Sequence, residues 1–209
     1  MNINTIRLRL ALGWLGMFLP WISLILSLIF GYGIPDSISA TYYFAPTITP
    51  FTVILGSASL LLISYAGYDK HDDIICTIAG IFGLLICIFP CSDSDLQYVG
   101  MLQLPIAISG WLHNICAISF FALLAYNSFF LFTKSSGCMT KNKESRNIIY
   151  KGCGIGMLVA FLLLIPLSYL DIHGGIWLIE MIALSFFGIS WLTKSDIYPW
   201  LFCDSPYTD

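Results

Sequence analysis

Residues 105–132 read PIAISGWLHNICAISFFALLAYNSFFLF, a stretch that contains no Asp, Glu, Lys or Arg. A helix needs about 20 mostly apolar residues to cross a bilayer, so this stretch is long enough to span a membrane. His113 and Asn114 stand out inside it because a polar side chain at membrane depth is costly unless it faces a partner or water. The stretch therefore predicts both a membrane-spanning helix and a candidate functional residue.

The whole chain has the composition of a membrane protein. Of its 209 residues, 58% are hydrophobic and 10% are charged, and the mean hydropathy is +0.85. Soluble domains carry about 25% charged residues. No linker, low-complexity tract or soluble insert interrupts the apolar runs. We predict an all-α integral membrane protein with a single polytopic domain over residues 1–209, a bundle of six transmembrane helices. The predicted spans are 10–30, 50–68, 74–91, 105–132, 149–170 and 176–192.

The basic residues predict how the chain is oriented. With six spans, all nine Lys and Arg fall on one side of the membrane. The positive-inside rule makes that side cytosolic, and an even number of spans places both termini there. The nine are Arg7, Arg9, Lys70, Lys134, Lys141, Lys143, Arg146, Lys151 and Lys194.

The opposite side is weakly acidic. Its predicted segments, 31–49, 91–104 and 171–175, contain no basic residue but hold Asp36, Asp93, Asp95 and Asp171. Such a face can attract cations, or it can consist simply of solvated loops.

Residues 35–46 are rich in hydroxyl groups and aromatic rings, which suits the membrane interface. The segment includes Ser37, Ser39, Tyr42 and Tyr43. It is either an interfacial cap over the bundle or a wall that supplies hydroxyl donors to a ligand headgroup.

His113 and Glu180 both lie a short distance inward from the acidic side of their predicted spans. Helical rise puts them at similar depth, so we expect an imidazole and carboxylate that can pair, as buried charges in membranes generally must. A structural hydrogen-bonded pair, or Glu180 reaching the interface, would explain the same pattern. The predicted ligand-binding set is Ser37, Ser39, Tyr42, Tyr43, Asp93, His113, Asn114 and Glu180.

The sequence assigns no cofactor and leaves a metal ion open. The seven cysteines show no Cys-x-x-Cys or Cys/His ligand spacing and are expected to be small buried hydrophobes, with Cys138 and Cys203 on the cytosolic side. Residues 68–73 predict a charge-paired turn with a helix N-cap rather than a metal site. Residues 134–151 could bind anionic headgroups or serve only to set topology.

Small residues permit close helix contacts at Gly80, Gly83, Ser57 and Ser59, and Gly152 and Gly156 have the GxxxG spacing. We expect them to pack inside one bundle, although such faces also permit a homo-oligomer. Membrane lipids are the expected partners, and no nucleic-acid partner is expected.

Several motifs carry a resemblance to known families: Ser-Ile-Ser-x-x-Tyr-Tyr at 37–43, Tyr-x-Gly-Tyr-Asp at 65–69, Leu-His at 112–113, Arg-Asn-x-x-Tyr at 146–150, and Glu180 followed by Phe-Gly-x-Ser-Trp-Leu-x-Lys at 187–194. With them the chain resembles a family of uncharacterised small six-span bacterial membrane proteins, which implies the bacterial inner (plasma) membrane but no activity. More distantly it is similar to the DRAM-like membrane proteins, which include the GPI-anchor remodelling factor. That resemblance implies a lipid-linked role.

These observations favour a protein that binds or handles a lipid or other amphiphile in a polar pocket open to the outer leaflet. One alternative is an intramembrane lipid hydrolase or acyltransferase in which His113 and Glu180 are catalytic, with or without a metal. Another is a small channel or a proton-coupled transporter.

Overall fold

The computed structural model describes residues 3–135, 140–170 and 172–195. Asp171, Cys138 and Cys203 lie outside them. Six helices are long and apolar enough to cross a membrane, which confirms the predicted all-α six-span bundle. They are α1 (Ile3–Ile29), α2 (Ala45–Ile63), α3 (Lys70–Ile88), α4 (Ile106–Tyr126), α5 (Lys141–Leu170) and α6 (Gly175–Lys194).

Short elements join these helices. A 3-10 helix, η1 (Ser39–Tyr43), precedes α2, and a π-helical turn, η2 (Asn127–Leu131), extends α4. A two-residue antiparallel pair, β1 (Tyr98–Val99) and β2 (Leu104–Pro105), forms a hairpin before α4.

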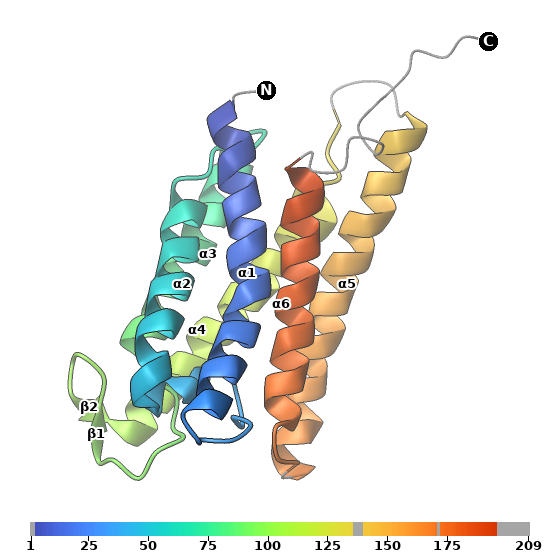
Figure 1. Ribbon diagram of the computed structural model, residues 1–209. Helices are drawn as coiled ribbons and strands as arrows, with labels where there is room; N and C mark the ends of the chain where they lie inside the picture. The colour runs from blue at the N-terminus through green and yellow to red at the C-terminus, as the bar shows by residue number, and fades with distance from the viewer. Residues whose placement is uncertain (1–2, 136–139, 171, 196–209) are drawn as a thin grey trace.

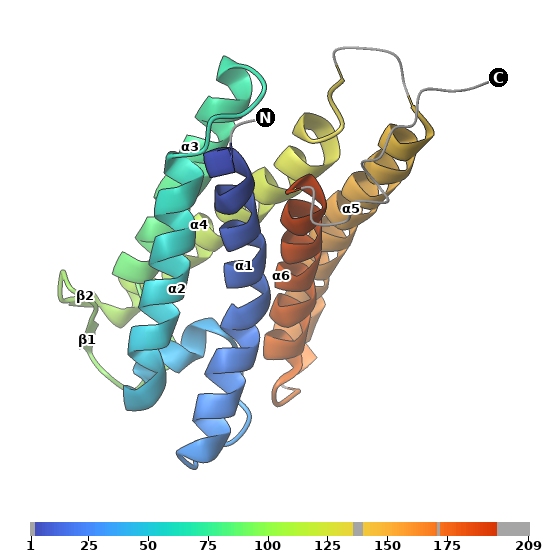
Figure 2. The same cartoon turned by 45° about the horizontal axis from the view of Figure 1, so that its top comes forward.

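The helices form a closed ring in chain order. Each packs closely against the next one along the chain, and α6 returns to pack against α1. In Figures 1 and 2, α2, α1, α6 and α5 stand side by side while α3 and α4 lie behind them. The core inside the ring includes Leu12, Leu62, Cys76, Leu124 and Trp191.

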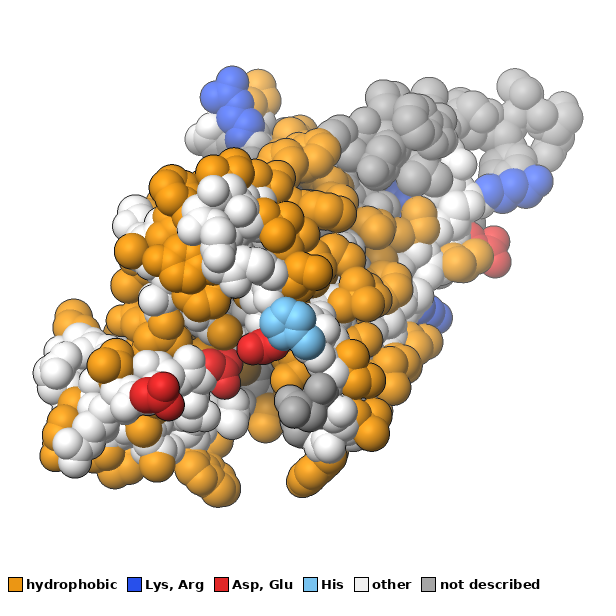
Figure 3. Space-filling model, turned by 60° about the horizontal axis from the view of Figure 1, so that its bottom comes forward, with side chains coloured by type: hydrophobic (Ala, Val, Ile, Leu, Met, Phe, Trp, Pro, Cys, Tyr) orange, Lys and Arg blue, Asp and Glu red, His pale blue; other side chains and the backbone are white. Residues whose placement is uncertain are grey.

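The ring has a basic end and an acidic end. The helix starts at Ile3, Lys70 and Lys141 and the helix end at Lys194 all lie at the upper end in Figure 1. Most Lys and Arg lie within about two turns of these helix ends in the sequence. We call this upper end the basic end. The β1–β2 hairpin and the segment 31–44 lie at the opposite, acidic end, where acidic side chains and one histidine cross a surface that otherwise shows hydrophobic and uncharged groups (Figure 3).

The outer surface of the ring is apolar, as a lipid-facing surface must be. Exposed side chains on it include Val53, Leu60, Ile118, Leu162 and Ile165. The molecule is therefore an integral membrane protein in contact with membrane lipids. The five described cysteines are free, and four of them are buried, as expected.

Several helix ends differ from the predicted spans. The second helix runs from Ala45 to Ile63 rather than from 50 to 68, because Pro46 suits the first helical turn and the residues after Ile63 form a turn. In that turn the Asp73 carboxylate accepts from the Gly67 N–H at 2.6 Å and the Asp72 carboxylate accepts from the Tyr68 N–H at 3.0 Å.

The other corrections have similar causes. The third helix ends at Ile88 rather than at 91, just before Pro90. Helices α1 and α5 begin well before their apolar runs, at Ile3 and Lys141, because a helix can continue into the polar region beyond the bilayer. The helix N-cap predicted within residues 68–73 is confirmed: it is Asp69, whose side chain accepts from the Asp72 N–H at 3.0 Å.

Candidate functional site

The segment 31–44 crosses the acidic end of the ring and is tied to helices on both sides. Near its start, the Ser27 hydroxyl at the end of α1 donates to the Gly33 carbonyl at 2.6 Å. Further along, the Trp177 N–H in α6 donates to the Asp36 carbonyl at 2.9 Å. The exposed side chains of Asp36 and His173 also form a hydrogen bond, with 2.7 Å between Oδ1 and Nδ1. The segment is therefore a fixed cap over the bundle.

Glu180 holds the middle of this cap. Its Oε2 accepts a hydrogen bond from the Ile38 backbone N–H at 2.6 Å, although the two residues are far apart in sequence. Ile38 is buried, whereas Glu180 on α6 retains partial exposure. A buried N–H needs an acceptor, and a Glu180 side-chain oxygen supplies it.

Ser37 connects the cap to the loop after α3. Its Oγ accepts from the Ala40 N–H at 2.8 Å and donates to Oδ2 of Asp93 at 3.3 Å. Asp93 is exposed, and it interacts electrostatically with both the His113 imidazole and the Glu180 carboxyl. Ser37, Asp93, His113 and Glu180 thus belong to one electrostatic neighbourhood, drawn from four separate stretches of the chain.

The two tyrosines of the cap have structural contacts. The Tyr43 hydroxyl donates to the Cys91 carbonyl, and burial raises the pKa of Tyr43, with Cys91, Asp93 and Tyr42 adding to the effect. The Tyr42 ring packs edge-on against Tyr43 and Phe51. At neutral pH both phenols are therefore uncharged donors.

His113 lies at the join between α3 and α4, and its partner is a backbone carbonyl. Its Nδ1 is 2.8 Å from the Phe89 carbonyl oxygen, and Ser109 one turn earlier donates to the Pro90 carbonyl at 2.8 Å. A carbonyl only accepts, so Nδ1 carries the proton and a neutral imidazole keeps Nε2 as an acceptor. Both contacts satisfy carbonyls left open where α3 ends.

The expected pair of His113 and Glu180 is not formed. The two described side chains share no hydrogen bond or ion pair, since His113 bonds to Phe89 and Glu180 bonds to Ile38. The physical reason is that a backbone group in need of a partner lies within hydrogen-bond distance of each side chain: the Phe89 carbonyl for His113 and the Ile38 N–H for Glu180. Asn114 is exposed on the surface of α4, whereas His113 is buried, so Asn114 does not share the neighbourhood of its sequence neighbour.

A cavity of about 40 Å³ lies inside the acidic half of the ring, next to the cap. All helices except α5 contribute to its wall, as does the cap, and every lining residue except Ser39 and Glu180 is apolar. The apolar walls are formed by Leu19, Ile38, Phe51, Leu55, Ile86, Ala117, Phe120, Phe121 and Leu184. The cavity therefore combines a hydrocarbon-like interior with one carboxyl and one hydroxyl group.

Of the predicted ligand-binding residues, Ser39 and Glu180 line this cavity. Ser37, Tyr43 and Asp93 lie in the hydrogen-bonded network at its cap, and Tyr42 packs there. Sequence reasoning missed the Ile38 N–H and the Phe89 and Pro90 carbonyls. Of these groups, only the two carbonyls had a sequence indication, because Pro90 predicts that the helix ends just before it.

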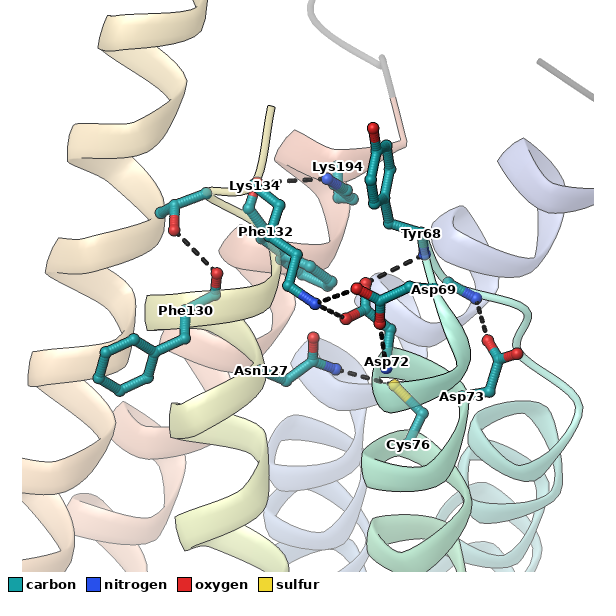
Figure 4. A network of polar contacts seen from close by, with 12 residues as sticks. Tyr68, Asp69, Asp72, Asp73, Cys76, Asn127, Phe130, Phe132, Lys134 and Lys194 are labelled. Atoms are coloured by element: carbon teal, nitrogen blue, oxygen red, sulfur yellow. Dashed lines mark hydrogen bonds and ion pairs between the residues drawn. The ribbon is translucent and has the colours of Figure 1, made fainter. Parts of the chain in front are cut away.

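The basic end holds a second polar network, drawn in Figure 4. The Lys134 ammonium forms ion pairs with Asp72 and, at 2.8 Å, with Asp69. The hydrogen bond from Lys134 lowers the pKa of Asp69 to about 2, and the Asp72 N–H adds to the effect. Asp69, His71 and Asp72 could place ligand atoms together for a metal ion, but Lys134 already supplies the cation there.

The fold and these networks define a class: a six-span all-α membrane protein whose central cavity is capped by a polar segment. Comparison with family models, curated proteins and solved structures found no match.

Proposed function

We propose that the protein binds an amphiphile at the acidic end, with the headgroup at Glu180 and the adjoining hydrocarbon between the apolar walls of the ring. The observation that carries this proposal is the composition of the cavity wall. A single carboxyl group and a single hydroxyl group sit in an otherwise apolar lining. Small-molecule sites commonly combine apolar walls with a few convergent polar groups.

The charge of the acidic end restricts the headgroup. None of the nine Lys and Arg lines the cavity, whereas Glu180 does and Asp93 is hydrogen-bonded to the cap through Ser37. An anionic headgroup would meet two carboxylates and no cation. A cationic or uncharged headgroup that donates hydrogen bonds suits this site.

The position of the cavity supports access from the membrane. By the positive-inside rule the acidic end faces outward, so the amphiphile would come from the outer leaflet. A volume of about 40 Å³ holds only a few atoms, and ligand entry therefore requires the ring to widen. Among the neighbouring helices of the described ring, α4 and α5 pack least extensively, so widening between these two helices breaks the fewest contacts.

The catalytic and transport alternatives have less support. His113 is not among the residues that line the cavity, and its Nδ1 is committed to the Phe89 carbonyl. Toward the basic end, the rings of Tyr65, Phe132, Tyr150 and Trp191 pack against one another inside the bundle. That packing disfavours an open pore.

The test uses purified full-length protein in neutral maltoside micelles and three C12 probes: an alkylamine, a monoacylglycerol and a fatty acid. Native mass spectrometry counts bound probe, and the shift in unfolding temperature reports affinity. We expect the amine and the monoacylglycerol to bind and the fatty acid not to bind. Glu180→Gln removes the charge but keeps an acceptor, so it should weaken amine binding about tenfold or more and leave monoacylglycerol binding nearly unchanged.

Asp95→Asn is the matched control, because it removes an exposed carboxylate from the same end without touching the cavity wall. Equal binding of the fatty acid, or an unchanged amine affinity in Glu180→Gln, would overturn the proposal.

A further inference from the structure

Two lysines at the basic end share one acceptor. The Phe132 carbonyl, just after η2, accepts from the Lys143 ammonium at 3.0 Å and from the Lys194 ammonium at 3.3 Å. The second of these contacts is drawn in Figure 4. Lys143 lies in the first turn of α5 and Lys194 is the last residue of α6, so the three chain segments meet at this carbonyl.

Aromatic rings complete the surroundings of the two ammonium groups. Lys194 lies 5.1 Å from the centre of the Phe132 ring and 5.6 Å from that of Tyr150, while Lys143 lies 5.7 Å from the centre of the Tyr150 ring. Tyr150 is buried, and both lysines are partly buried. The pair is thus held in place by packing rather than extended into solvent.

These contacts leave the positive charge largely uncompensated. A helix C-terminus carries only about half a negative charge, and ring faces carry none in net terms. In the described parts of the chain, no carboxylate comes within 4.0 Å of either ammonium. Asp72 does interact electrostatically with Lys194, but it is already paired with Lys134.

Further cations increase the local charge. Arg146 interacts electrostatically with both lysines, and Arg9 interacts with Lys194. The Arg9 guanidinium also donates to the Lys194 carbonyl at 3.1 Å and to the Tyr65 hydroxyl at 3.1 Å. Four basic side chains from three helices therefore converge at one end of the ring.

We propose that Lys143 and Lys194 form a binding site for a phosphate group at the basic end. Each ammonium has three N–H donors and uses one on Phe132, which leaves donors for the oxygens of one phosphate. Lysine binds phosphate as a point charge, and a pair is well suited to a doubly or singly charged anion. The phosphate can belong to an anionic lipid headgroup in the adjacent leaflet or to a free phosphate ion.

The experiment distinguishes these two sources. Full-length protein is placed in nanodiscs of phosphatidylcholine, with or without phosphatidylglycerol, and retained lipid is counted by native mass spectrometry. In parallel, inorganic phosphate is added to protein in neutral micelles and the unfolding temperature is measured. Retained phosphatidylglycerol without a phosphate-induced shift identifies a lipid headgroup, and a phosphate-induced shift identifies a site that takes the free anion.

Variants test whether the two lysines are responsible. Lys143→Gln/Lys194→Gln should weaken anion binding about 30-fold, whereas Lys143→Arg/Lys194→Arg should keep it. Lys70→Gln/Lys151→Gln is the matched control, since it also removes two cations but both are exposed and outside the cluster. If the double Gln variant does not fold, Lys143→Gln alone should weaken binding about fivefold.

Equal retention of phosphatidylglycerol in the site variant and the control variant would overturn the proposal. So would the absence of both lipid retention and a phosphate-induced shift in the unsubstituted protein. The proposal does not depend on the amphiphile site at the other end of the ring.

Discussion

The Glu180 carboxylate accepts a hydrogen bond from the Ile38 N–H at 2.6 Å, across a sequence separation of 142 residues. This contact joins the last helix to the segment that caps the acidic end. It also gives Glu180 two tasks, since the same carboxyl lines the central cavity. Substitutions at Glu180 can separate the structural task from the ligand-binding one.

Glu180→Ala should destabilise the folded protein by about 1–3 kcal/mol, because it leaves the buried Ile38 N–H without an acceptor. Glu180→Gln should cost much less, since its amide oxygen can replace the carboxylate oxygen. Unfolding in micelles, followed by the change in tryptophan fluorescence, measures the difference. The idea fails if both variants lose the same stability, or if limited proteolysis shows no increased cleavage in 31–44 for Glu180→Ala.

The ion pair between Lys134 and Asp69 should contribute a pH dependence to the free energy of unfolding, and this contribution should change only at acidic pH. The folded-state pKa of Asp69, about 2, lies below its ordinary value of 3.8. The contribution is therefore fully present above about pH 4 and is lost as the pH falls through about 2. Asp69 is exposed, so the effect on stability is small and is best measured at the residue itself.

Lys134→Met should return the pKa of Asp69 toward its ordinary range, as measured by NMR titration of the labelled carboxyl carbon. Lys70→Met removes an exposed cation at the start of α3, directly after Asp69. It should leave the pKa of Asp69 nearly unchanged. Similar titration curves for the two variants would contradict this assignment.

His113→Asn should preserve more stability than His113→Gln. The Asn side-chain nitrogen occupies nearly the position of Nδ1 and can donate to the Phe89 carbonyl, whereas Gln places its amide nearer to the position of Nε2. His113→Ala should cost about 1–3 kcal/mol, because it leaves a helix-terminal carbonyl without its donor. Unfolding midpoints rank the three variants, and a ranking with Gln above Asn would show that the Nδ1 contact is not the important one.

The number of spans and their charge polarity could be predicted because both depend on properties that add along the chain. Each span contains a long hydrophobic run, and all Lys and Arg segregate to one end. Helix ends were less predictable. The turn that follows α2 is held by hydrogen bonds from the Gly67 and Tyr68 N–H groups to the carboxylates of Asp73 and Asp72. That turn depends on residues that follow it in the sequence.

The placement of the candidate residues at one end of the bundle was predictable for the same reason, whereas their role as a site stays a prediction. Depth along a helix brought Glu180 and His113 to the acidic end, and the segment with Ser37 lies over them. Their partners were not predictable, because Ile38 and Phe89 contribute backbone groups, which leave no signature in side-chain type. The expected pairing of His113 with Glu180 was wrong because these backbone groups take up both side chains.

Glycines at helix contacts give a last prediction, which separates packing within the ring from packing between copies. Gly80 on α3 lies so close to α2 that an added Cβ would overlap the Ser59 carbonyl, a backbone atom that cannot turn aside. Gly80→Ala should therefore destabilise the protein by about 1–3 kcal/mol. Gly152 on α5 has open space around its Cβ position, so Gly152→Ala should leave the stability of the monomer unchanged or slightly raised.

The measurement is unfolding of both variants in micelles, combined with light scattering to determine the oligomeric state. Gly156 packs against Phe186 inside the ring, so only Gly152 of the GxxxG pair is open to another copy. If α5 contacts a second copy at Gly152, Gly152→Ala should shift the protein toward monomer while its fold stays intact. An unchanged mass would show that Gly152 makes no contact between copies. A loss of stability in Gly152→Ala as large as in Gly80→Ala would contradict the ring packing itself, because the structure places no atom within 4 Å of the added Cβ.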